Sequence, residues 1–350
     1  MRSRRWSLSS SLAIVALVLT GCTSPDSAVV PEPSSSPTTS AEPAPTIRVQ
    51  PPVIAVVLPR ATSMHPPELA RQRDSLQALA DELMASGRAS AVRVLVPVGT
   101  ATLDEVVLAQ ADLGADLVCA IGQRAIRVVL EAAAEYPGTR FCAAPAGSSN
   151  VPENVLALAF RSEEQAFLAG VAAGLQPGAT PGVVLRDAGL ADRLRSAFEA
   201  GLRLVGPVED DSVGLGLVAD EAQARSDAEA RYDTGIFTLW TRAGRFERGV
   251  LEAAEDRRRI LIGSLEWLAA DPEVGDVPWT LMLQGEDYAV PVAVAFEELT
   301  NGWTGGPRSL GFAQDAFVIE GGGSSLWSGI EAQIMQTRDA IADGAVAVPS

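Results

Sequence analysis

The stretch DLVCAIGQRAIRVVLEAAAEYPGTRFCAA (116–144) contains a complete strand, helix and second strand. Its two ends, DLVCAI and TRFCAA, are continuous apolar runs, whereas the segment between them repeats apolar residues at helical spacing. Continuous apolar strands are typical of parallel sheets that helices cover on both faces. The stretch therefore predicts a βαβ unit.

The same alternation extends in both directions along the chain. Upstream, VIAVVL (53–58) and AVRVLV (91–96) are separated by a helical segment at 67–86. Downstream, the pattern begins again at NVLALAF (154–160) and continues through the predicted strands 181–186, 213–218 (the least certain), 235–240 and 259–265. A strand pair or a connection follows at PRSLGFAQDAFVIE (307–320). We therefore predict two α/β lobes, 47–157 and 158–282, with part of 283–350 returning to the first.

Two such lobes facing each other would place a ligand cleft beyond the carboxyl ends of their strands. The candidate ligand-binding residues are those that follow strands: Arg60, Gln123, Phe160, Asp187, Trp240, Glu266 and Trp267. Either tryptophan offers a face on which a planar ligand stacks, and the two carboxylates accept hydroxyl protons. Core packing is the alternative for the aromatic residues, and a solvated loop position is the alternative for the charged ones.

The N-terminus has the features of an export signal. Three arginines precede a short apolar run that ends in LTGC (19–22), which resembles a bacterial lipobox. This resemblance implies cleavage after residue 21 and lipidation of Cys22, with an ordinary signal peptide as the alternative. Residues 22–46 are rich in Pro, Ser and Thr, and we predict a tether. We expect the protein at the outer face of the cell membrane.

Charge and composition exclude several classes of function. The net charge of −17 disfavours binding to nucleic acid. All 27 basic residues are arginine, which excludes a Walker-type phosphate loop and a Schiff-base lysine. The single histidine, His65, which we interpret as a surface or turn residue, cannot build the usual zinc sites. Because no nucleophile-elbow motif occurs either, we expect no enzyme, cofactor or metal.

Three smaller patterns need an interpretation. Cys119 and Cys142 lie in neighbouring predicted strands, where side-by-side cysteines often lack bridging geometry, so we expect buried thiols, with a disulfide as the alternative. GVAAG (170–174) predicts close packing of a helix against a sheet, and not a membrane dimer. GLGLVA (214–219) has dinucleotide-loop spacing but follows an acidic, polar segment, so we interpret it as a loop or short strand.

From 116 to 175 the chain is similar to the basic membrane protein family of bacterial substrate-binding lipoproteins, which includes purine nucleoside receptors. The similarity continues in RAGRFERGVLEAAED (242–256) and AVAFEELTNGWTGGPRSLGFAQDAFVIE (293–320). It implies a type I periplasmic-binding fold, with two parallel-sheet α/β lobes around a ligand cleft. It also implies delivery of a small polar ligand, commonly a nucleoside, to the permease subunits of an ABC importer.

The chain departs from this family where the family contacts its ligand. Its loop after the first strand reads PRATSMHPPE (59–68), without the family's Asp and Phe-Asn pair. SLEWLA (264–269) replaces the aspartates for ribose hydroxyls, and LMLQGED (281–287) lacks the usual lysine. We therefore predict a solute-binding lipoprotein of an importer. Its ligand is a small polar molecule whose identity does not follow from the sequence. The alternative is a sensor or protein-interaction lipoprotein with a degenerate pocket and no transport cargo.

Overall fold

Two six-stranded sheets organise the part of the chain that the computed structural model describes, residues 50–60, 65–148, 150–176, 180–186, 188–206, 214–268 and 278–349. The predicted signal peptide, Cys22 and the tether lie outside these residues. The described residues belong to one unit, Val49–Ser350. Within them, no helix combines the length and the apolar character needed to cross a membrane.

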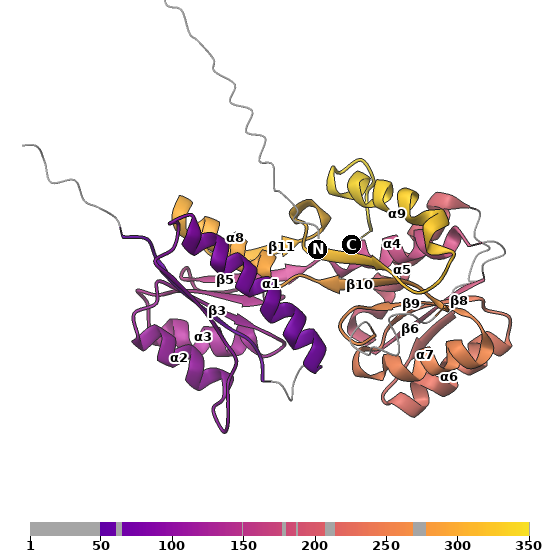
Figure 1. Ribbon diagram of the computed structural model, residues 1–350, viewed down its shortest axis with the longest axis horizontal. Helices are drawn as coiled ribbons and strands as arrows, with labels where there is room; N and C mark the ends of the chain where they lie inside the picture. Colours follow the sequence, from indigo (N-terminus) through magenta and orange to yellow (C-terminus); the bar gives the residue numbers. More distant parts are fainter. Residues whose placement is uncertain are drawn as a thin grey trace, which may run out of the picture. The chain divides into compact units, whose positions relative to one another are not determined.

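The first sheet is entirely parallel and has helices on both faces (Figure 1). Its spatial order is β11 (Gly306–Leu310), β5 (Val155–Phe160), β4 (Arg140–Ala144), β3 (Leu117–Ile121), β1 (Val53–Val57) and β2 (Ala91–Leu95). One face packs on α1 (Pro66–Ala85) and α8 (Ala289–Asn301), the other on α2 (Leu103–Asp112) and α3 (Ala125–Glu135). Alternate residues of β1 enter the two opposite cores, which explains why the strand is apolar throughout.

The second sheet repeats this plan with one antiparallel edge. Its order is β12 (Phe317–Gly321), β10 (Thr280–Glu286), β9 (Ile260–Ser264), β8 (Thr238–Arg242), β6 (Pro181–Leu185) and β7 (Gly214–Leu217), and β12 alone runs antiparallel. One face packs on α4 (Ser162–Gly174), α5 (Ala188–Val205) and α9 (Trp327–Ala342). The other packs on α6 (Glu221–Asp233) and α7 (Glu247–Arg257), which a short 3₁₀ turn, η1 (Gly244–Phe246), precedes.

The segment 307–320 is a connection and not a strand pair, which is the second of the two forms predicted for it. It contains two strands, but they do not pair with each other: β11 pairs with β5 in the first sheet and β12 with β10 in the second. The 3₁₀ turn η2 (Phe312–Gln314) redirects the chain between them, so that each strand extends a different sheet. The segment is therefore a crossover between the two halves.

The expectation of two buried thiols was wrong, because Cys119 and Cys142 form a disulfide. The parallel register of β3 and β4 places the two residues directly opposite each other, with their Cα atoms 4.4 Å apart. This separation lies at the short end of the range that a disulfide spans.

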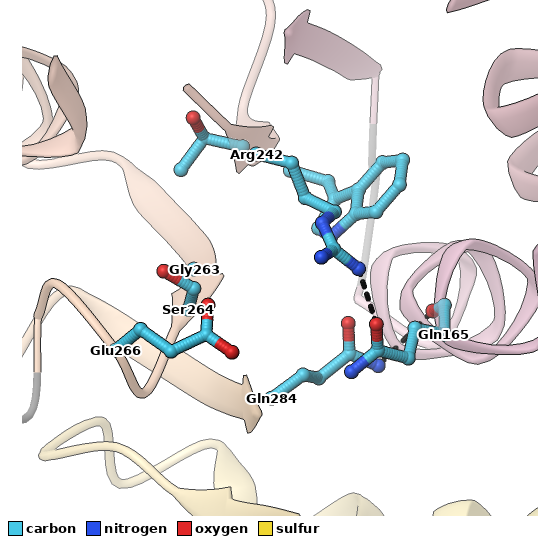
Figure 2. Close-up of a pocket in the computed structure, with 8 residues that line it drawn as sticks. Gln165, Arg242, Gly263, Ser264, Glu266 and Gln284 are labelled. Carbon is cyan, nitrogen blue, oxygen red and sulfur yellow. Dashed lines mark hydrogen bonds between the residues drawn. The ribbon is translucent and has the colours of Figure 1, made fainter. Parts of the chain in front are cut away.

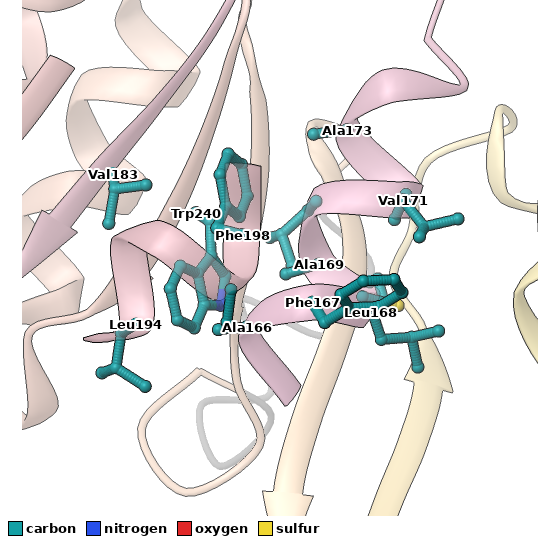
Figure 3. Packing of buried hydrophobic residues seen from close by; sticks show 14 of the residues in the cluster. Ala166, Phe167, Leu168, Ala169, Val171, Ala173, Val183, Leu194, Phe198 and Trp240 are labelled. Atoms are coloured by element: carbon teal, nitrogen blue, oxygen red, sulfur yellow. The ribbon is translucent and has the colours of Figure 1, made fainter. Parts of the chain in front are cut away.

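The two glycines of GVAAG pack closely against a helix, α5, while the helix that contains them, α4, also lies on the sheet as predicted. A Cβ atom added at Gly170 would lie 2.0 Å from the carbonyl oxygen of Phe198 in α5, and one at Gly201 would lie 1.9 Å from that of Phe167 in α4. The two helices therefore meet backbone to backbone. Figure 3 shows this core, in which the Phe198 ring stacks on Trp240 with centroids 5.6 Å apart.

We expect Gly201→Ala to lower the free energy of unfolding by about 1 to 3 kcal/mol, because the added methyl group forces α4 and α5 apart. Urea denaturation monitored by circular dichroism measures the effect. The matched control is Gly329→Ala, since Gly329 is an exposed glycine of α9 whose added Cβ meets no atom within 4 Å. The control should stabilise the helix slightly. Equal effects of the two substitutions would contradict the close approach of α4 and α5.

Candidate functional site

The carboxyl edge of the second sheet brings together polar side chains from three neighbouring strands. Arg242 ends β8, Ser264 ends β9 and Glu286 ends β10. Residues of these three strands and of α4 surround a cavity of about 10 Å³, here called the inner cavity, which has room for about one water molecule. Glu286 lies next to it and does not line it. Its lining consists of Gln165, Trp240, Thr241, Arg242, Gly263, Ser264, Glu266 and Gln284 (Figure 2).

Arg242 lines the inner cavity and is held there by its neighbours. Its guanidinium donates hydrogen bonds to the Gln165 side-chain oxygen and, over 3.2 Å, to Oε1 of Glu286. Gln284 donates in turn to the Gln165 carbonyl oxygen over 3.0 Å. Burial lowers the pKa of Arg242, but the carboxylates of Glu286 and Glu266 outweigh it and raise that pKa above its ordinary value. The inner cavity is thus closed around a permanent cation.

Two carboxyl groups near the cavity hold their protons more tightly than usual. Burial raises the pKa of Glu247 to about 7, although the backbone and side chain of Ser264 both donate hydrogen bonds to it, over 2.9 and 2.8 Å. Burial, and next the charge of Glu286, raise the pKa of Glu266 to about 8, against the opposing effect of Arg242. Glu266 is therefore mostly protonated at neutral pH.

Helix α1, in the first half of the molecule, contacts the carboxyl edge of the second sheet. The carbonyl oxygen of Glu286 accepts hydrogen bonds from Arg71 Nη2 over 3.0 Å and from Gln72 Nε2 over 2.8 Å. The carboxylate of Glu286 also accepts one from the Tyr288 hydroxyl over 2.9 Å. Arg71 is itself paired with the buried Glu68 at 2.8 Å. Residues of both halves therefore meet at the end of β10.

A second and larger hollow, here called the outer pocket, has a volume of about 300 Å³. Its lining consists of His65, Glu221, Arg245, Arg248, Leu251, Trp267 and Leu268. His65 directly precedes α1, and its ring centroid lies 5.6 Å from that of Trp267, which follows β9. The pocket therefore combines an apolar floor, two aromatic rings and charged groups, with residues from both halves of the molecule.

Three of the seven predicted ligand-binding residues line these two spaces. Glu266 and Trp240 contact the inner cavity, and Trp267 contacts the outer pocket. Trp240 is 1% exposed and stacks on Phe198, so one of its faces belongs to the core.

The remaining four residues lie elsewhere or outside the described residues. Arg60 donates a hydrogen bond to the carbonyl of Gly99, and Gln123 is exposed after β3. Phe160 packs against Tyr288 and Phe317, with ring centroids 5.5 and 5.9 Å away, and therefore joins the two halves. Asp187 lies outside the described residues.

The sequence interpretation missed Arg242, Glu286 and His65. It ended the strand at residue 240, whereas β8 continues to Arg242, so Trp240 was taken for the residue at the strand end. β10 likewise runs to Glu286, and the acidic QGED (284–287) was the available signal there. His65 was taken for a surface or turn residue, because nothing local in the sequence reveals that it faces Trp267.

The fold is that of the type I periplasmic-binding proteins, as predicted. A solved structure, the solute-binding protein of an ABC transporter system from Conexibacter woesei, superposes with a TM-score of 0.63. It is 20% identical and covers 85% of this chain and 98% of its own. At that identity the likeness shows the fold alone.

The sequence comparisons agree with the family resemblance described above. A sequence model described as "ABC transporter substrate-binding protein PnrA-like" matches residues 101–264. A CD4+ T-cell-stimulating antigen of Listeria monocytogenes is 23% identical over 67% of this chain and 70% of its own length. Basic membrane protein A of Borreliella burgdorferi is 30% identical over 41% of this chain and 44% of its own. The resemblance to the basic membrane protein family is thus confirmed, and it supports a solute-binding role.

We expect Glu266→Gln to flatten the pH dependence of stability. The pKa of Glu266 is about 8 in the folded protein and about 4.5 when unfolded, so the unfolded chain binds fewer protons between these values. The stability that Glu266 contributes is therefore complete below pH 4.5 and is lost as the pH rises to 8. Urea denaturation at pH 4.5, 6 and 8 measures this slope.

The control for this prediction is Glu331→Gln, on the exposed face of α9. It should leave the slope of the unmodified protein unchanged. A Glu266→Gln variant with the same slope as the Glu331→Gln variant would show that Glu266 ionises normally.

Proposed function

We propose that this protein is the solute-binding lipoprotein of an ABC importer and that it captures a small polar solute in the outer pocket. The observation that carries the proposal is the composition of that pocket. His65 precedes α1 in the first half and Trp267 follows β9 in the second, and both line a single hollow of about 300 Å³. This volume is at the lower end of the range for small-molecule sites.

The inner cavity is less suited to hold the solute. Its volume of about 10 Å³ excludes anything larger than a water molecule while Arg242 is bound to Gln165 and Glu286. We therefore propose that the polar residues around the inner cavity have a structural role and do not bind the solute.

A solute in the outer pocket would contact both halves of the molecule, because each half contributes residues to the lining of this pocket. A solute that touches both His65 and Trp267 favours the arrangement in which the two halves lie close, since it binds that arrangement better than an open one. The permease subunits would then recognise the closed, loaded protein. A nucleoside is one candidate cargo, because two aromatic rings offer surfaces for a planar base.

A sensor or protein-interaction role without cargo is the second candidate function. The inner cavity favours it, because the protein's own side chains occupy the place at the carboxyl edge where a ligand of this fold is expected. In that case the outer pocket would bind no solute.

A thermal-shift screen against nucleosides, nucleobases, sugars and amino acids distinguishes the two functions. A ligand at 100 times its Kd should stabilise the protein by about 2.7 kcal/mol. Trp267→Ala should weaken binding of the hit at least about tenfold, because it removes one aromatic wall. Trp303→Ala, in the first half of the molecule, is the matched control and should bind normally. A folded protein that no solute stabilises would support the sensor function instead.

We further propose that Cys22 carries the lipid that anchors the protein, with the tether 22–46 between the lipid and the folded part. Cys22→Ser should abolish incorporation of labelled palmitate and release the protein from the membrane fraction, since acyl chains supply the anchoring. Cell fractionation and metabolic labelling measure both effects. Normal labelling of the Cys22→Ser variant would show that the lipid is attached elsewhere or is absent.

A further inference from the structure

Arginines gather at the outer pocket, although the chain as a whole is strongly acidic. Arg245 and Arg248 line the pocket, in a protein whose net charge is −17. A third, Arg186, lies close by: its guanidinium carbon is 5.7 Å from the ring centroid of Phe246, and that of Arg245 is 4.9 Å from the same ring. One carboxylate, that of Glu221, stands among the lining residues.

Two of these arginines are available to a ligand. Neither Arg186 nor Arg245 has an ion-pair partner among the residues that the structure describes, and both side chains are exposed. Most arginines on the neighbouring helices are paired, as Arg225 is with Glu252 at 2.8 Å. A cation–π contact with Phe246 does not use the N–H donors of a guanidinium group, so these donors can still bind an acceptor.

Hydrogen-bond donors converge at Gly244, in the turn before α7. A Cβ atom placed on Gly244 would lie 3.5 Å from Nη1 of Arg186 and 3.9 Å from the indole nitrogen of Trp267. Both atoms are N–H donors, and Gly244 carries no side chain between them. The geometry is thus a small donor-rich recess beside an aromatic wall.

Such a recess selects for negative charge. Guanidinium groups bind carboxylates and phosphates through paired, charge-assisted hydrogen bonds, and an indole N–H adds a further donor. A neutral sugar or nucleobase would leave these donors without acceptors of matching charge. The cationic recess also offsets the repulsion that an anion meets at the rest of this acidic surface.

We propose that the solute in the outer pocket carries an anionic group, a carboxylate or a phosphate, which Arg186 and Arg245 hold next to the indole of Trp267. This inference rests on the proposed solute-binding function and adds the chemical class of the solute.

The test measures binding of paired probes to the full mature protein. The two probes of a pair share a ring system and differ in charge. One pair is guanosine and guanosine 5′-monophosphate, and the other is indole-3-acetamide and indole-3-acetate, so that the two pairs distinguish phosphate from carboxylate. Isothermal titration calorimetry should show that the anionic member of at least one pair binds tenfold or more tightly than its neutral partner. Added salt should reduce this preference.

Substitutions of the two arginines then test whether they bind the anionic group of the probe. The double variant Arg186→Gln, Arg245→Gln should bind the anionic probe no more tightly than the neutral one. Arg186→Lys, Arg245→Lys retains the charge and should keep part of the preference, which separates charge from packing on Phe246. Arg203→Gln is the matched control, since Arg203 is an exposed arginine of α5 that pairs with Glu199 at 3.3 Å.

Each other outcome overturns the inference. Equal binding of the neutral and anionic probes removes the charge preference and leaves the proposed function intact. A preference that survives the double Gln substitution places the anion elsewhere. Binding of neither member of either pair also refutes it, while a thermal shift with any other solute in the screen leaves the proposed function standing.

Discussion

The end of β10 is the point at which the two halves of the protein are held together. There the chain leaves the second sheet for α8, and each polar group of Glu286 has a hydrogen-bond partner. Its backbone N–H donates to Glu266, and its carbonyl oxygen accepts from Arg71 and Gln72. Its carboxylate accepts from Arg242 and Tyr288. Glu286 is 7% exposed. Removing one partner of a buried charge is strongly destabilising, so this network fixes both the crossover and the position of α1.

The same network determines where open space remains at this edge of the second sheet. Because Arg242 is needed to neutralise Glu286, it remains in the inner cavity, and the deepest part of the carboxyl edge is occupied. The space that remains open lies farther out, between His65, Trp267 and the start of α7. The stability of the crossover and the location of the open space are thus two results of one buried ion pair.

The fold could be predicted from the sequence more fully than the site. Strands such as β1 are apolar on both faces because two cores meet at them, and that pattern is local. The pairing of β11 and β12 with different sheets is not local, and neither is the parallel register that joins Cys119 to Cys142. A predicted residue lines a cavity where the strand end was placed to within one residue, as for Glu266 after β9. At β8 the end was placed two residues too early, and Arg242 was missed.

The loop after β9 carries other side chains than the family resemblance implies, although the architecture is that of the family. The family resemblance implies that residues 264–269 contact the solute, yet consecutive residues here serve different purposes. Glu266 lines the inner cavity and accepts a hydrogen bond from the backbone of Glu286, whereas Trp267 lines the outer pocket near the Arg186 guanidinium. Carboxylates that would bind ribose hydroxyls are thus replaced at the pocket by an aromatic wall and cations. The scaffold tolerates this exchange because the network at Glu286, and not the ligand contacts, holds the crossover in place.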